Sequence, residues 1–98
     1  MASPTEDDHF RPGIAALQGS RAAEAQAHFQ AAVDTGLATS KSWLGLTLAS
    51  LVLGDNLAAE VAVDEVLTRE PHNLRGLIIK GDLLLGRMSN AKRYRITT

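Results

Sequence analysis

SKSWLGLTLASLVLGDNLAAEVAVDEVLTREPHN, residues 40–73, contains the signals that decide the fold. The stretch divides into two helical patterns, residues 40–53 and residues 56–69, separated by a short turn. Asp55 stands at the start of the second pattern, where aspartate is a favoured N-cap residue. Pro71 ends that pattern, because proline cannot continue a helix. Residues 40–73 therefore predict a pair of helices joined by a tight turn.

The same pattern recurs along the chain at a step of about 34 residues, which is the length of a helix-turn-helix repeat. The step aligns residues of similar size in several series: Phe10 with Leu44 and Ile78, Leu17 with Leu51 and Leu85, and Ala25 with Ala59. We therefore interpret residues 1–98 as a single domain. Its repeats cover about 6–39, 40–73 and an incomplete 74–98.

Start and stop signals predict the first helix of the chain. Ser3 is a suitable N-cap, and Glu6 stands three residues later, as in a capping box. The helix is expected from about residue 4 to residue 18, with a bend near Pro12 because the ring of proline disturbs the preceding turn.

Similar signals predict the remaining helices. A second helix is expected over 21–35, closed by Gly36 in the left-handed conformation. Asn73 is expected to cap a further helix that runs to about Gly86. After Gly86 the sequence shows no complete second helix for the third repeat.

The residues at these positions resemble the tetratricopeptide repeat (TPR) family. The middle unit has residues typical of the family at five of its characteristic positions: Trp43, Leu46, Gly54, Ala59 and Pro71. The resemblance implies an all-α fold of antiparallel helix-turn-helix (TPR-like) repeats. These repeats would form a short right-handed α-solenoid of about 2.5 repeats. The resemblance also implies that Trp43 packs between the helices of the middle repeat.

The first unit matches the same family through Gly13, Ala25, Phe29 and Ala32. Small residues at such positions let two helices approach closely, while large apolar residues fill the space between them. Thr47 departs from the pattern, because it stands where the middle repeat would have a small Gly or Ala.

Composition and motifs give no sign of catalysis or of a metal site. The chain has no cysteine, which excludes disulfides and thiolate metal ligands. His9, His28 and His72 fall in separate elements, and acidic residues 6–8 are explained by the dipole of the helix that they begin. No nucleophile, triad or glycine-rich phosphate loop is visible. We therefore expect no enzymatic activity, no cofactor and no bound metal.

Charge and hydropathy bear on location and on partners. The formal net charge is -1, which gives no reason to expect nucleic acid or an anionic membrane as the main partner. No apolar run approaches the roughly 18 residues of a spanning helix, and no signal peptide pattern is present. We expect a cytoplasmic protein.

In the TPR family, the first helix of each repeat lines a concave groove. Carrying the groove positions of the family onto this chain gives a partner-binding groove of Phe10, Ile14, Leu17, Lys41, Leu44, Leu48, Leu51, Arg75, Ile78, Asp82 and Leu85. This groove is mostly apolar, and exposed apolar patches on soluble proteins mark interfaces. The subgroup that binds chaperone tails has Lys and Asn where Phe10 and Ile14 stand, so we reject that class of partner.

Two functions therefore remain open. The first is a non-catalytic protein–protein interaction module, or scaffold, whose groove binds an apolar helix or an extended peptide, or which self-associates as a homodimer. The alternative is an accessory N-terminal segment of a larger enzyme. Residues 73–85, NLRGLIIKGDLLL, are similar to repeats that precede the catalytic domain of some aspartyl/asparaginyl hydroxylase-like proteins. A third interpretation treats the groove residues as the core of a small compact stub.

Overall fold

The computed structural model describes the backbone of residues 5–96 and the side chains of residues 5–86. Every regular element in this part of the chain is an α-helix, so the fold is all-α, as the sequence predicts. The helices in chain order are α1 (Glu6–Gln18), α2 (Ala22–Asp34), α3 (Ser40–Val52), α4 (Asn56–Arg69) and α5 (Leu74–Ile96).

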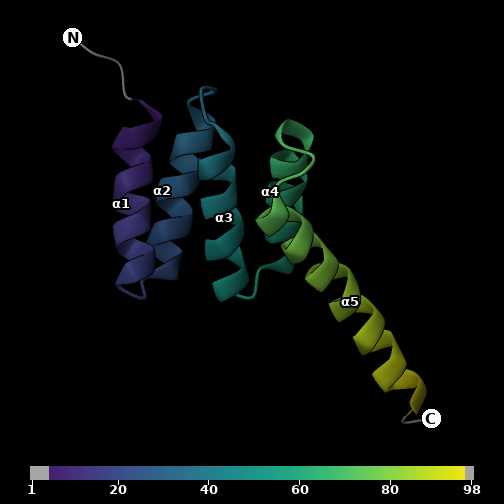
Figure 1. Cartoon of the computed structure of the whole chain (residues 1–98). Coiled ribbons are helices and arrows are strands. Elements are labelled where there is room, and N and C mark those ends of the chain that lie inside the picture. Colours follow the sequence, from purple (N-terminus) through teal and green to yellow (C-terminus); the bar gives the residue numbers. More distant parts are fainter. Residues whose placement is uncertain (1–4, 97–98) are drawn as a thin grey trace.

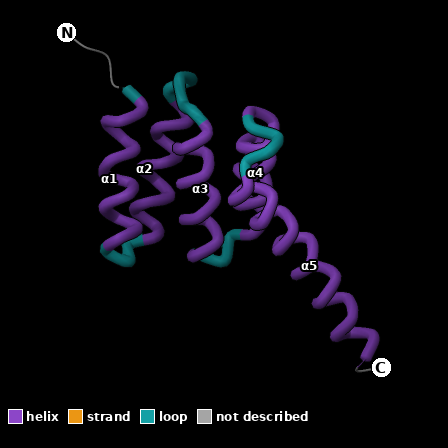
Figure 2. The backbone as a smooth tube through the Cα atoms, viewed as in Figure 1, coloured by secondary structure: helices purple, strands orange, loops and turns teal. Residues whose placement is uncertain are grey.

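The helices stack in the order of the sequence, with their connecting turns at alternating ends (Figures 1 and 2). Helix α2 packs against both α1 and α3, and α4 packs against both α3 and α5. Beyond its first turns, α5 extends away from the other helices, so the molecule is elongated at 62 × 28 × 18 Å (Figure 1).

Three predicted helix ends are confirmed. The Asp55 side chain caps α4 by accepting a hydrogen bond from the Ala58 N–H at 3.1 Å. The Asn73 side chain accepts one from the Gly76 N–H at 2.8 Å, at the start of α5. Gly36 follows α2 with a φ of 77°, the left-handed conformation that glycine adopts without strain. Local capping chemistry therefore sets these boundaries.

Helix α1 begins later than the sequence predicts. Thr5 is its N-cap residue, and the Asp8 carboxylate accepts the Thr5 N–H at 2.8 Å. The predicted cap, Ser3, lies outside the described residues. The helix continues through Pro12 to its end. Proline removes one N–H donor, and the remaining turns of the helix are retained.

Helix α5 is longer than predicted, because it passes Gly86 and reaches Ile96. A glycine in a helix interior costs only about 1 kcal/mol, so it does not by itself end a helix. The described residues include no second helix for the third repeat. That part of the prediction agrees with the structure.

Phe29 is the centre of the core. Its fully buried ring lies between Gly13 of α1 and Gly45 of α3. A Cβ atom on Gly13 would lie 2.7 Å from the Phe29 Cε1 atom, and one on Gly45 would lie 2.5 Å from it. The helices can close on the ring only because both positions are glycine. The sequence interpretation placed the small residue of the middle repeat at Thr47, whereas the structure uses Gly45.

Trp43 has a smaller role in the core than the sequence predicts. It is half-buried, packs against the edge of the core, and has the Arg69 guanidinium carbon 5.3 Å from its ring centroid. Phe29 is fully buried, as predicted, and so is Val63 of α4. The space between the helices is therefore filled mainly by Phe29.

We predict that Gly45→Ala destabilises the protein. The added methyl group overlaps the Phe29 ring, and overpacking costs about 1–3 kcal/mol, which exceeds the helix propensity that alanine gains. Gly86→Ala is the matched control, because a Cβ there meets nothing within 4 Å. We expect it to stabilise by about 0.5–1 kcal/mol. Urea unfolding measures both changes.

A double variant tests the cause. Phe29→Leu removes the ring atoms that the new methyl group meets, so the combined cost of Gly45→Ala and Phe29→Leu is expected to be smaller than the sum of the separate costs. Additive costs would show that Gly45 acts through something other than Phe29.

Candidate functional site

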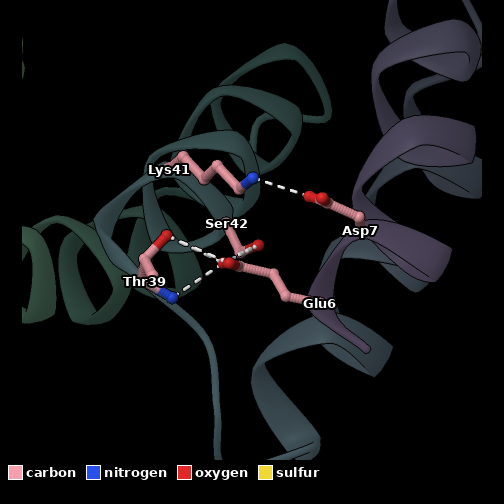
Figure 3. Close-up of polar contacts among 5 residues, drawn as sticks. All are labelled: Glu6, Asp7, Thr39, Lys41 and Ser42. Carbon is pink, nitrogen blue, oxygen red and sulfur yellow. Dashed lines mark hydrogen bonds and ion pairs between the residues drawn. The ribbon is translucent and has the colours of Figure 1, made fainter. Parts of the chain in front are cut away.

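Glu6, in the first turn of α1, bridges to the start of α3 (Figure 3). Its Oε2 atom accepts the Thr39 N–H at 2.7 Å and the Ser42 hydroxyl at 2.6 Å. The Thr39 hydroxyl donates to the same oxygen at 3.0 Å. Thr39 is the N-cap residue of α3, where backbone N–H groups lack partners within the helix. The Glu6 carboxylate therefore supplies a capping acceptor from another helix.

An ion pair lies beside this bridge. The Lys41 Nζ atom is 2.6 Å from Asp7 Oδ1 and 4.8 Å from the centroid of the Phe10 ring (Figure 3 shows the ion pair). The Phe10 ring in turn lies 5.7 Å from the ring of Phe29. Lys41 and Phe10, both predicted groove residues, are thus in contact with each other. We call Glu6, Asp7, Thr39, Lys41 and Ser42 the polar clasp.

The clasp favours the charged forms of its members. Partial burial raises the pKa of the Glu6 carboxyl, but the hydrogen bonds from Ser42 and Thr39 outweigh it and hold that pKa below its ordinary 4.5. The hydrogen bond with Lys41 lowers the pKa of Asp7, and the same contact raises the pKa of Lys41. The clasp is therefore strongest when both carboxylates are ionised.

The apolar groove residues of α1 and α3 are partly covered by their own chain. Ile14 and Leu17 pack against the core from α1 and are half-buried. Leu44 and Leu48 on α3 are also half-buried. All four residues keep part of their surface open, and Ile14 and Leu17 also pack against the core.

Residues of α3, α4 and α5 line a cavity of about 300 Å³ that is partly open to solvent. Leu51 lines it from α3 and Asp82 from α5, so the structure brings these two predicted groove residues together. Ile79 and Leu83 of α5 and Glu60 of α4 complete most of the wall. The lining combines the apolar side chains of Leu51, Ile79 and Leu83 with the polar ones of Asn56, Glu60 and Asp82.

The remaining groove residues lie on α5 and are exposed. Arg75 is in its first turn, and Ile78 and Leu85 are 54% and 59% exposed. Leu77 and Leu84 beside them, which the incomplete third repeat leaves without a second helix to cover them in the described residues, are exposed by a similar amount, at 46% and 45%.

Sequence reasoning also missed the polar clasp. It explained the acidic residues at 6–8 by the dipole of α1 alone, whereas Glu6 and Asp7 bond to residues of α3. The repeat step was the signal that could have found the clasp, because it places the start of α1 beside the start of α3.

Over the described side chains, no group of three or more metal-ligating residues comes together. Among the described helices, none is both long enough and apolar enough to cross a membrane. Comparisons with family models, with curated proteins and with solved structures find no match. The candidate site is therefore defined by the geometry of this chain: the polar clasp, the cavity and the exposed face of α5.

We predict that the clasp makes stability depend on pH. Because the pKa of folded Glu6 lies below its ordinary value, its contribution is complete above about pH 4.5 and is lost as the pH falls through the lowered pKa. Glu6→Gln removes the charge and is expected to lower the free energy of unfolding by about 1–3 kcal/mol at neutral pH. The difference between wild type and variant should shrink in acid, where the wild-type carboxyl is also neutral.

Glu24→Gln is the control for this experiment. Glu24 forms an exposed ion pair with Arg21, and such pairs contribute at most about 1 kcal/mol. Urea unfolding of the three proteins from neutral to acid pH gives the comparison. A gap between wild type and Glu6→Gln that stays constant with pH would contradict the assignment.

Proposed function

We propose that the chain is a non-catalytic protein–protein interaction module built from TPR-like helical repeats, whose groove binds an apolar helix or an extended peptide. The observation that carries the proposal is the cavity between α3, α4 and α5, where Leu51, Ile79 and Leu83 form apolar walls. Binding pockets are typically apolar with a few polar groups that orient the ligand. Asp82 and Glu60 supply such groups at this site.

The exposed residues of α5 support the same proposal. Ile78 and Leu85 lie about one helical turn before and after the cavity-lining Asp82, and they are more than half exposed. A contiguous apolar patch on a protein surface is typical of an interface. A bound segment that inserts one apolar side chain into the cavity would cover both the cavity and this patch.

The α1 end of the groove is a weaker candidate for contact with a partner. Phe10 and Lys41 are held against each other, and Lys41 is also held by Asp7. We therefore place the binding region at the α3–α5 end of the predicted groove. The accessory-segment interpretation remains a prediction of the sequence, and no contact in the described residues favours it over the interaction module.

We predict that peptides selected against the wild-type protein bind at the cavity. Helical and extended peptides are selected from a phage-displayed library, and the best binder is labelled and titrated by fluorescence anisotropy. Leu51→Asp places a charge in the apolar wall and is expected to weaken binding at least about ten-fold, which is about 1.4 kcal/mol. Asp82→Lys, at an exposed position, is expected to act similarly with less effect on folding.

The control variant is Leu57→Asp, at a 73% exposed position of α4 that does not line the cavity. It should bind the peptide as the wild type does, and circular dichroism establishes that each variant is folded. Selection that yields no peptide, or a peptide whose affinity is the same for the wild type and both cavity variants, would refute the proposal.

A further inference from the structure

Helix α5 has two apolar faces, and only one of them lies next to another helix. Gly76 lies on the inner face, because a Cβ atom there would be 3.0 Å from the Leu67 side chain of α4. Ile79 and Leu83 lie on the same side, where they line the cavity next to α4. A helix that packs on one neighbour normally presents a polar face to solvent. The outer face of α5 departs from that rule.

The outer face is centred on Gly81. Successive residues of an α-helix are rotated by about 100°, so the residues three and four positions before and after Gly81 share its side of the helix. Those positions hold Leu77, Ile78, Leu84 and Leu85, which are 46%, 54%, 45% and 59% exposed. We call these four residues and Gly81 the outer seam.

The outer seam is symmetric about its glycine. Reversing the chain direction at Gly81 exchanges the positions of Leu77 and Leu85, and those of Ile78 and Leu84. A two-fold dimer needs a self-complementary surface of this kind, because one patch serves both partners. A Cβ atom on Gly81 would meet nothing within 4 Å, so a second helix has room to approach closely there.

Helix α3 shows how such positions are covered within the chain. The repeat step places Thr47 and Ser50 of α3 at the positions that Gly81 and Leu84 hold in α5. Thr47 and Ser50 are fully buried where α3 packs against α2 and α4. Helix α4 packs against α5 as α2 packs against α3. The described residues contain no further helix that would pack against α5 as α4 packs against α3. The vacant place is that of an antiparallel helix.

We propose that two copies of the chain pair through the outer seam, with their α5 helices antiparallel and crossing at Gly81. Ile78 of one copy then lies beside Leu85 of the other, and Leu77 lies beside Leu84. Leu74, which is 71% exposed, lies on the same side of the helix. Together the exposed surface of these five residues in two copies amounts to roughly 1,000 Å², which is the size that a specific interface needs. The pairing goes beyond the peptide-binding proposal, because the outer seam and the predicted groove are different surfaces. They have only Ile78 and Leu85 in common.

Sedimentation equilibrium tests the association. We expect the mass of the wild-type protein to rise with concentration from 10.5 kDa toward twice that value. Leu84→Asp and Gly81→Glu each place charges in the seam and should weaken dimerisation at least about ten-fold. Gly81→Glu is the safer variant for folding, because its position has open space around it. Leu57→Asp should dimerise as the wild type does. A wild type that stays at monomer mass up to millimolar concentration, or seam variants that dimerise normally, would overturn the proposal.

Cysteine cross-linking tests the geometry, and the chain is suited to it because it has no cysteine of its own. A disulfide needs Cα atoms about 4.4–6.8 Å apart. Gly81→Cys should therefore form a disulfide-linked dimer readily in a redox buffer, whereas the control Ala27→Cys, exposed on α2, should not. Equal linkage of the two variants would contradict a crossing at Gly81.

A second pair of variants determines the direction of the helices. Leu77→Cys alone should not link to itself, but an equal mixture of Leu77→Cys and Leu84→Cys should give the mixed dimer. Self-linkage of Leu77→Cys would indicate parallel helices and would overturn the antiparallel arrangement. If the cysteine variants do not cross-link but the protein still binds the peptide, the dimer proposal alone is refuted. Cross-linking without peptide binding would refute the groove alone.

Discussion

The Phe29 ring determines how closely the first three helices pack, because it occupies the space that Gly13 and Gly45 leave free. One aromatic residue on α2 thus sets the separation of α1 and α3, which also contact each other. That separation also brings the N-terminal ends of α1 and α3 within hydrogen-bond distance, so Glu6 can reach Thr39 and Ser42. The polar clasp therefore depends on the apolar packing beneath it.

The two junctions between repeats are built differently. At the first, the carboxylate of Glu6 in α1 caps the start of α3. At the second, the repeat step places Ser40 where Glu6 stands, and Asn73 caps α5 from within its own turn. Helix α5 instead relies on α4, through packing at Gly76 and an ion pair between Lys80 and Asp64. The firmly joined part of the molecule is thus at α1–α3, and the open apolar surface is at α5.

Much of the fold follows from local chemistry in the sequence, and the remainder depends on contacts between helices. Asp55, Asn73 and Gly36 could be assigned because capping depends on a few neighbouring residues. Gly45 was missed because the repeat register places the small residue of the middle repeat at Thr47. Only the packed structure shows that position 45, and not position 47, meets the Phe29 ring. The exposed groove residues on α5 were identifiable from the pattern. The burial of those on α1 was not, because it depends on how the helices stack.

The side-by-side stacking of the helices also means that the protein need not open as one unit. In the described residues, the main contacts of each helix are with its near neighbours along the stack, and the glycine contacts of Phe29 are with α1 and α3. Local opening free energies in such arrays differ from one region to another. Helix α5 can therefore separate from α4 while the packing around Phe29 stays intact, so backbone amides near α5 will exchange hydrogen with solvent sooner than those of α2.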